Sequence, residues 1–426
     1  MSTVATQFEA PASQVKDLRP PRQRIAEYIF LFLIAFSLLN VVSIVLRYFD
    51  VDELPINPVV VAVSALAILI TNPPKPKYEK RYFVVAWIFF ALYVLIGIAA
   101  IQKPRNVEFK AALQDAVKLP INFIVIPWLG MRLANPVFIR RCFQMCVVII
   151  AAGGIFAAIQ FVYPGPFDFM LSAEGRGAGF WVNPNLCGAL CLFAFLISFI
   201  WPFQKSAWNV LARLSFLAGM LASSSRADLG AFVLALVVAL IVRKDMKTAI
   251  WVAFSAALVF TLLSTVDVSA VLAKIVPEGH RAASFARLAN GEVTGVVEED
   301  IRWQVWQYAG RVAMDNFAVG CGLTCMDHVA PFSTRGLGPH NFYLYILGTS
   351  GIVTLLAFLF YGACLFLWAL QVKEMVPRAM SVAYVAGFAM MLMFDHAFPM
   401  IQAMCPMFLF FAVLSAEKDV SLPAYL

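Results

Sequence analysis

Long apolar runs, separated by short polar segments, dominate the hydrophobic pattern of the chain. Many of these runs approach 20 residues, which is enough for a helix to cross the hydrocarbon core of a bilayer. Twelve candidate spans follow from the pattern: 25–46, 58–71, 82–101, 119–133, 142–163, 186–203, 208–223, 229–242, 248–266, 342–372, 378–394 and 400–415. The pattern therefore predicts an all-α polytopic membrane protein with about 12 transmembrane helices.

The distribution of Lys and Arg predicts the orientation of these spans. Basic residues gather in alternate loops, at 72–81, 132–141, 205–213, 243–247 and 373–378, which places those loops and the N-terminus in the cytoplasm. The segment 102–118 is an exception, because it carries four basic residues on the outer side. The expected organisation is a cytoplasmic tail (1–24), nine spans (25–266), one long periplasmic cap loop (267–341), three spans (342–416) and a cytoplasmic tail (417–426).

Composition supports a membrane protein and argues against a soluble domain, a nucleic-acid-binding protein and a metal site at the cysteines. Apolar residues make up 62% of the chain and charged residues 13%, whereas soluble domains are about 45–50% apolar. The net charge of +7 is spread over short loops, so no clustered basic face predicts nucleic-acid binding. Cys321 and Cys325 have only His328 nearby, which is too few ligands for a metal site. We therefore expect no metal and no nucleic acid.

Four charged residues near the outer ends of spans are the candidates for chemistry, because charge is costly there. Arg226, in a Ser-Ser-Ser-Arg-Ala-Asp turn, suits phosphate binding, or else it snorkels or pairs with Asp228. His340 suits a general base, or else it is an interfacial histidine with a backbone partner. Arg176 lies among glycines that let a ligand approach, or else in a flexible surface loop. Arg302 lies on an expected amphipathic helix at 301–315, where a solvated charge is the default.

These positions, in this order, resemble the O-antigen ligase/polymerase superfamily of bacterial envelope glycosyltransferases. The most specific element is His340-Asn341 followed by Gly351 and Thr354 at the spacing of the ligases. Upstream, the segment 315–323 is similar to the family's Pro-x-x-Gly-x-Gly element, with Phe317-Ala318 where proline is usual. Ser225-Arg226 is similar to its Ser-Arg element, and Gly175-Arg176 with 183–185 to its Gly-Arg…Asn-Pro-Asn element.

The resemblance implies a GT-C-like membrane glycosyltransferase whose donor is a glycan on undecaprenyl diphosphate, used at the periplasmic face of the inner membrane. An acceptor hydroxyl, expected on lipid A–core, attacks the anomeric carbon with inversion, without metal, nucleotide sugar or other cofactor. Arg226 and Arg302 would stabilise the leaving diphosphate. His340 would accept or orient the acceptor proton, and Arg176 and Asn341 would help to bind substrate. Arg287 is a rival to Arg302 in the same loop.

Three other functions stay open from the sequence. The superfamily also contains polymerases, which join carrier-linked repeats into O-antigen or exopolysaccharide, and protein or pilin glycan ligases. A secondary transporter also has about twelve spans, but it often shows internal repeats and midplane polar helices, which this chain lacks. The spacing from His340 to Thr354 favours a ligase over a polymerase.

Overall fold

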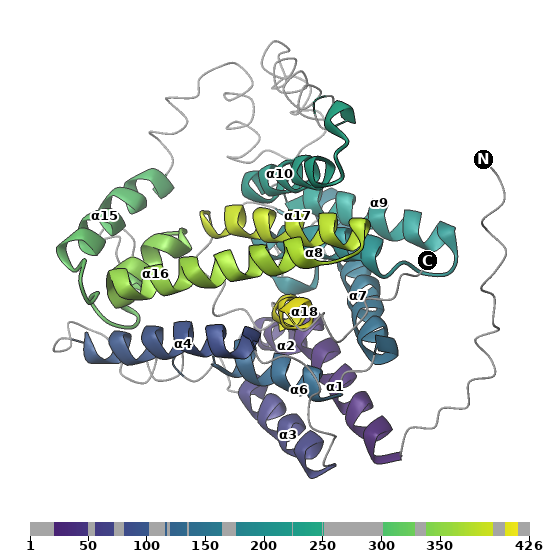
Figure 1. Cartoon of the computed structure of the whole chain (residues 1–426), viewed down its shortest axis with the longest axis horizontal. Coiled ribbons are helices and arrows are strands. Elements are labelled where there is room, and N and C mark those ends of the chain that lie inside the picture. The colour runs from purple at the N-terminus through teal and green to yellow at the C-terminus, as the bar shows by residue number, and fades with distance from the viewer. Residues whose placement is uncertain are drawn as a thin grey trace.

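The chain folds as a bundle of helices (Figure 1). The computed structural model describes residues 21–49, 56–71, 81–101, 116, 120–133, 136–163, 176–223, 225–248, 250, 301–328, 338–394 and 405–415. Every element within these ranges is helical, which confirms the predicted all-α class. The helices are α1 (Pro21–Leu39), α2 (Val41–Tyr48), α3 (Ile56–Ile70), α4 (Arg81–Ala99), a π-helix (Ile121–Val125), α6 (Ile126–Leu133), α7 (Pro136–Val162), α8 (Pro184–Ile200), α9 (Ser206–Ser223), α10 (Arg226–Val242), α15 (Ile301–Asp315), α16 (Phe342–Gln371), α17 (Met375–Leu392) and α18 (Cys405–Ser415).

Four of the described helices, α4, α7, α16 and α17, are long and apolar enough to cross a membrane. The side chains of Trp87, Leu95 and Phe360, on α4 and α16, are large, apolar and exposed, as expected for surfaces that face lipid. The chain is therefore a membrane protein, and the count of twelve spans stays a prediction. The ninth expected span (248–266) lies outside the described residues from 251 onward, as does most of the expected cap loop.

The interior of the bundle is formed by α8 and α18. Nearly every residue of α8 is buried, and α8 packs against α7, α9, α10 and α17. All residues of α18 are buried, and Figure 1 shows this helix almost end-on while α16 and α17 lie across the view. At about 1.5 Å per residue, the eleven residues of α18 are too short to span a bilayer. The described part of the twelfth expected span is thus a buried core helix.

The first expected span (25–46) is not one continuous helix. α1 ends at Leu39 and α2 begins at Val41, because Asn40 adopts a left-handed conformation with φ 49°. Trp181, which is far away in the sequence, stabilises this break with two hydrogen bonds. Its indole donates to the Leu38 carbonyl (2.7 Å), and the Asn40 amide donates to the Trp181 carbonyl (3.4 Å). An apolar pattern alone does not reveal such a partner.

The fourth expected span (119–133) contains a π-helix that leads into α6. Pro127 has no N–H to donate to the Phe123 carbonyl four residues earlier. The Tyr82 hydroxyl of α4 donates to that carbonyl instead, at 3.1 Å. A buried side chain thus satisfies the backbone group that the proline leaves open, as a membrane environment requires.

α16 is broken at Gly351, where φ is 75° and ψ is −177°. The loop that follows α15 seals this break with backbone hydrogen bonds. Cys321 N donates to the Gly348 carbonyl (2.7 Å), Gly322 N donates to the Thr349 carbonyl (3.0 Å), and Ile352 N donates to the Phe317 carbonyl (2.9 Å). The Thr354 hydroxyl donates to the Ser350 carbonyl (2.9 Å). The segment Phe342–Ser350 is therefore a half-helix fixed to the loop 316–323.

Glycines make this close approach possible. A Cβ at Gly351 would collide with the Ala318 carbonyl, and one at Gly320 would collide with the Thr349 carbonyl. The spacing that marked 315–323 and 340–354 in the sequence therefore has a structural cause: the two segments meet backbone to backbone.

We predict that Gly351→Ala destabilises the protein by at least about 2 kcal/mol, because alanine disfavours the left-handed region and its methyl group has no room. Thermal unfolding of the detergent-solubilised protein measures the change. Gly362→Ala is the matched control on the same helix, since nothing lies within 4 Å of a Cβ there; it should be neutral or stabilising by about 0.5–1 kcal/mol. Equal effects at both positions would contradict this account of the break.

Candidate functional site

The first two turns of several helices approach the C-terminal end of α17. The Tyr343 hydroxyl, in the first turn of α16, donates to the Ala389 carbonyl at 3.0 Å. Gly230 of α10 lies against the Met390 side chain, because a Cβ there would be 2.9 Å from the Met390 Cε. The Trp306 ring of α15 lies 5.8 Å from the Phe394 ring, centroid to centroid. The starts of α10, α15 and α16 therefore share one end of the bundle.

Each of these helices begins with a residue singled out from the sequence. Arg226 is the first residue of α10, Arg302 is the second residue of α15, and His340 directly precedes Asn341, the N-cap of α16. The structure thus brings the three positions to a common region. The side chains of Arg226 and Arg302 lie outside the described part, as does the whole of Arg287.

Helix N-termini add a favourable field for an anion at this end of the bundle. The Asn341 side chain accepts a hydrogen bond from Leu344 N (3.1 Å), and the Ser225 hydroxyl accepts one from Asp228 N (3.4 Å). N–H groups in a first turn carry partial positive charge and commonly bind phosphate groups. This arrangement suits a diphosphate.

His340 occupies a left-handed backbone position, with φ 46°, and its side chain is half-buried. The residues before it, Gly338 and Pro339, are buried. Histidine tolerates this conformation better than most residues, yet the conformation remains uncommon and is found at functional sites. The backbone therefore fixes His340 at the entrance to the half-helix.

Arg176 is buried and caps the end of α9. Its Nε donates to the Ser223 carbonyl (2.7 Å) and one terminal nitrogen donates to Asn185 Oδ1 (2.8 Å). The adjacent Gly177 N donates to the Ala222 carbonyl (3.1 Å). Carbonyls at a helix C-terminus lack partners within the helix and attract cations. The alternative of a flexible surface loop is therefore wrong for Arg176, while its expected role in substrate binding stays a prediction.

Gln160 of α7 holds the segment after Arg176. Its Oε1 accepts from Ala178 N (3.0 Å) and Gly179 N (2.8 Å), and its amide nitrogen donates to the Gly179 carbonyl (3.3 Å). Gln160 is not among the residues singled out from the sequence, although an amide near the end of an apolar run is an available signal for a structural polar contact, and the structure shows it fully buried.

Asp228 was considered only as a partner for Arg226. It is buried in the first turn of α10 and lies against Gly188 of α8, where any larger residue would collide with its carboxylate. The Cys187 thiol lies within electrostatic reach of both Asp228 and Arg176. A buried acid and a buried base therefore share the corner formed by α8, α9 and α10.

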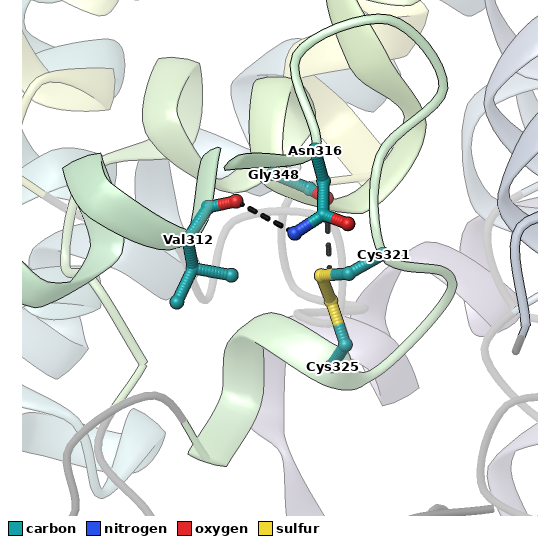
Figure 2. Close-up of a disulfide and its surroundings, with 5 residues drawn as sticks. All are labelled: Val312, Asn316, Cys321, Cys325 and Gly348. Atoms are coloured by element: carbon teal, nitrogen blue, oxygen red, sulfur yellow. Dashed lines mark hydrogen bonds between the residues drawn. A yellow bond between two sulfur atoms is a disulfide. The ribbon is translucent and has the colours of Figure 1, made fainter. Parts of the chain in front are cut away.

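Cys321 and Cys325 form a disulfide beside the break in α16 (Figure 2). The sequence analysis weighed these cysteines only as metal ligands, and the disulfide removes both thiolates from that role. Figure 2 shows Cys321 beside Gly348, with the Asn316 amide bonded to the Val312 carbonyl at 2.9 Å. The bridge therefore links Cys321, which contacts the half-helix, to Cys325 just beyond the loop 316–323.

Comparison with known families supports the resemblance drawn from the motifs. The family model described as O-antigen ligase matches residues 211–359. The matched segment runs from α9 to α16, so it includes Arg226, Arg302, His340 and Gly351, and it excludes Arg176. A comparison with curated proteins gives no match.

These findings define the class of the protein. It is a membrane protein, and the match confirms its similarity to the O-antigen ligase-like superfamily. That superfamily points to a membrane glycosyltransferase of the O-antigen ligase or polymerase type, acting on glycan or lipid-linked substrates.

We expect Arg176→Lys to lower stability by about 1–3 kcal/mol, because one ammonium group cannot reproduce the two directed hydrogen bonds to Ser223 and Asn185. Thermal unfolding measures this loss, and Arg311→Lys on the exposed face of α15 is the control. Unchanged stability would contradict the capping role. Wild-type stability with lost activity would instead assign Arg176 to direct substrate binding.

We also expect peptide mapping without reduction to recover Cys321 and Cys325 as a linked pair. The double variant Cys321→Ser/Cys325→Ser should lose about 2 kcal/mol of stability, the chain-entropy value for so short a loop. Cys364→Ser, at a free cysteine of α16, is the control and should change stability little. Free thiols at both positions in protein isolated with alkylating agent would argue against the bridge.

Proposed function

We propose that the protein transfers a glycan from undecaprenyl diphosphate to an acceptor hydroxyl, on lipid A–core, at the periplasmic face of the inner membrane. The observation that carries the proposal is the approach of the first two turns of α10, α15 and α16 to the end of α17. A leaving diphosphate needs positive charge and N–H donors, and these helix starts with their arginines would provide both.

The reaction forms one bond and breaks another at the anomeric carbon. The acceptor oxygen attacks this carbon from the face opposite the diphosphate, so the configuration inverts. The bond between the anomeric carbon and the diphosphate oxygen breaks, and its electron pair leaves with the lipid diphosphate. His340 takes the proton of the acceptor hydroxyl. Arg226 and Arg302 stabilise the growing negative charge, and Asn341 helps to orient the substrate from the N-cap of α16.

The periplasmic orientation gains support from the disulfide. The bacterial cytoplasm keeps thiols reduced, whereas disulfides form and persist in the periplasm. Cys321–Cys325 lies in the loop directly after α15 and contacts the half-helix that follows His340. This location agrees with the outer side that the positive-inside rule assigns to the same loop.

We expect deletion of the gene to leave lipid A–core bare while long glycan accumulates on undecaprenyl diphosphate. Complementation with His340→Ala should lower transfer by about 10²–10⁴-fold, the usual contribution of a general base. His328→Ala, in the loop before His340, is the matched control and should restore transfer. Gel analysis of envelope glycolipids and extraction of carrier-linked glycan measure both pools.

Other outcomes of the same experiment separate the competing functions. Single repeats with no long chains in either pool would identify a polymerase instead of a ligase. Full complementation by His340→Ala would remove His340 from the chemistry. No change in either pool after deletion would contradict transfer to these two substrates.

A further inference from the structure

α15 carries an aromatic face that its packing against the bundle uses only in part. Val305, Ala309 and Ala313 are fully buried and form one stripe at a spacing of four residues, and α15 packs on α16. At 100° per residue, Trp303, Trp306, Gln307 and Gly310 share a different face of the helix. We call these four residues the α15 shelf.

The side chains of the α15 shelf differ in their exposure to solvent: Trp303 and Gln307 are exposed, and Trp306 is half-buried. The Trp303 ring is 44% exposed and its centroid lies 6.5 Å from that of Trp306, which is half-buried and reaches Phe394, two residues beyond the end of α17. The Gln307 amide is exposed. Among the residues that the structure describes, no atom lies within 4 Å of a Cβ built at Gly310, so they leave the space beside the rings open. The shelf is thus an aromatic surface with a polar group and a gap beside it.

The Trp306 indole has a further property. Its Nε1 is shielded from solvent and has no hydrogen-bond partner among the residues that the structure describes. A shielded N–H without a partner costs free energy, and tryptophan usually places this group on an acceptor. The inner end of the shelf therefore favours a partner that brings oxygen acceptors.

This combination fits a pyranose ring. One face of such a sugar presents C–H groups that pack on an aromatic ring, while its edges present hydroxyls that bond to an amide such as Gln307. A small residue beside the ring lets the sugar lie flat. A lipid tail would use the aromatic rings but would leave the Gln307 amide without a partner.

The position of the shelf relates it to the diphosphate. Arg302 begins the same helix, and the eight residues from Arg302 to Gly310 extend ~12 Å at the helical rise. That length accommodates the first sugars attached to a diphosphate bound at the helix start. We propose that the α15 shelf is a stacking subsite for the first pyranose rings of the carrier-linked donor. This assignment rests on the proposed function.

The test uses the full-length protein in lipid nanodiscs with carrier-linked glycan as donor. Trp303→Ala should raise the KM for donor about ten-fold, the scale of one aromatic stacking contact, and leave kcat unchanged. Gln307→Ala should raise this KM about three-fold, the smaller share of a single neutral hydrogen bond. Gly310→Leu should raise it as well, by filling the open space without a collision at its Cβ.

Tyr308→Ala is the matched control, because Tyr308 is an exposed aromatic residue on the opposite flank of α15, where Arg311 lies over its ring at 5.7 Å. It should leave the KM unchanged. Equal KM values for wild type and Trp303→Ala would overturn the subsite. A fall in brominated-phospholipid quenching of tryptophan fluorescence on Trp303→Phe would also overturn it, because Trp303 would then face the membrane.

A binding experiment separates failure of the subsite from failure of the proposed function. The probe is the soluble oligosaccharide released by mild acid from the carrier, observed by saturation-transfer NMR. If wild type binds it and Trp303→Ala does not, the subsite stands even where no transfer occurs. If transfer proceeds while binding and KM are the same in both proteins, transfer stands and the subsite is wrong. Absence of both binding and transfer in wild type overturns both.

Discussion

The break in α16 depends on three backbone hydrogen bonds. They join the residues around the break to the loop 316–323, which precedes α16 in the chain. The carbonyls of Gly348 and Thr349 and the N–H of Ile352 border this break, and Gly348 and Thr349 are buried, so their backbone groups need partners within the protein. The loop 316–323 satisfies all three through its own backbone. Only glycine at positions 320 and 351 allows the two chains to come this close. Without this contact, α16 would have either to run straight past residue 351 or to leave polar groups unpaired in an apolar environment.

This contact joins two parts of the candidate site into one unit. The loop 316–323 begins at the end of α15, the helix that carries Arg302. It makes hydrogen bonds to the half-helix that begins after His340. Ser350 and Leu323 then fix the unit to α4, through the Tyr93 and Gly97 carbonyls at 2.9 and 3.0 Å. The start of α10 reaches the same region by a separate route, through its packing on α17. A catalytic group and a diphosphate group can therefore be positioned by rigid elements even though they are far apart in sequence.

The sequence predicted the parts of the fold that depend on local pattern, and it missed those that depend on distant partners. The helix 301–315 was predicted with the bounds that the structure has, because its apolar spacing and polar remainder are local. The breaks at Asn40 and Gly351 and the π-helix before Pro127 interrupt runs that are apolar throughout, and their partners are Trp181, the loop 316–323 and Tyr82. Motif order singled out the candidate site positions, and their roles stay predictions. Asn185 belonged to one of these motifs, but its contact with Arg176 and the contacts of Gln160 were not predicted, since a polar residue in an apolar run does not say which group it meets.

The burial of Arg176 bears on how positive charge is divided in the site. A buried guanidinium in a medium of low dielectric needs compensation, and Arg176 finds it in the carbonyl end of α9 and in the Asn185 side chain. Charge that is already balanced by the protein is less available to a substrate. Under the proposed function, a diphosphate at the end of α17 would draw its stabilisation from Arg226, Arg302 and the N-termini of α10 and α16. On this argument Arg176 acts by fixing the corner of α8, α9 and α10, and thereby the place where α10 and its first residue begin.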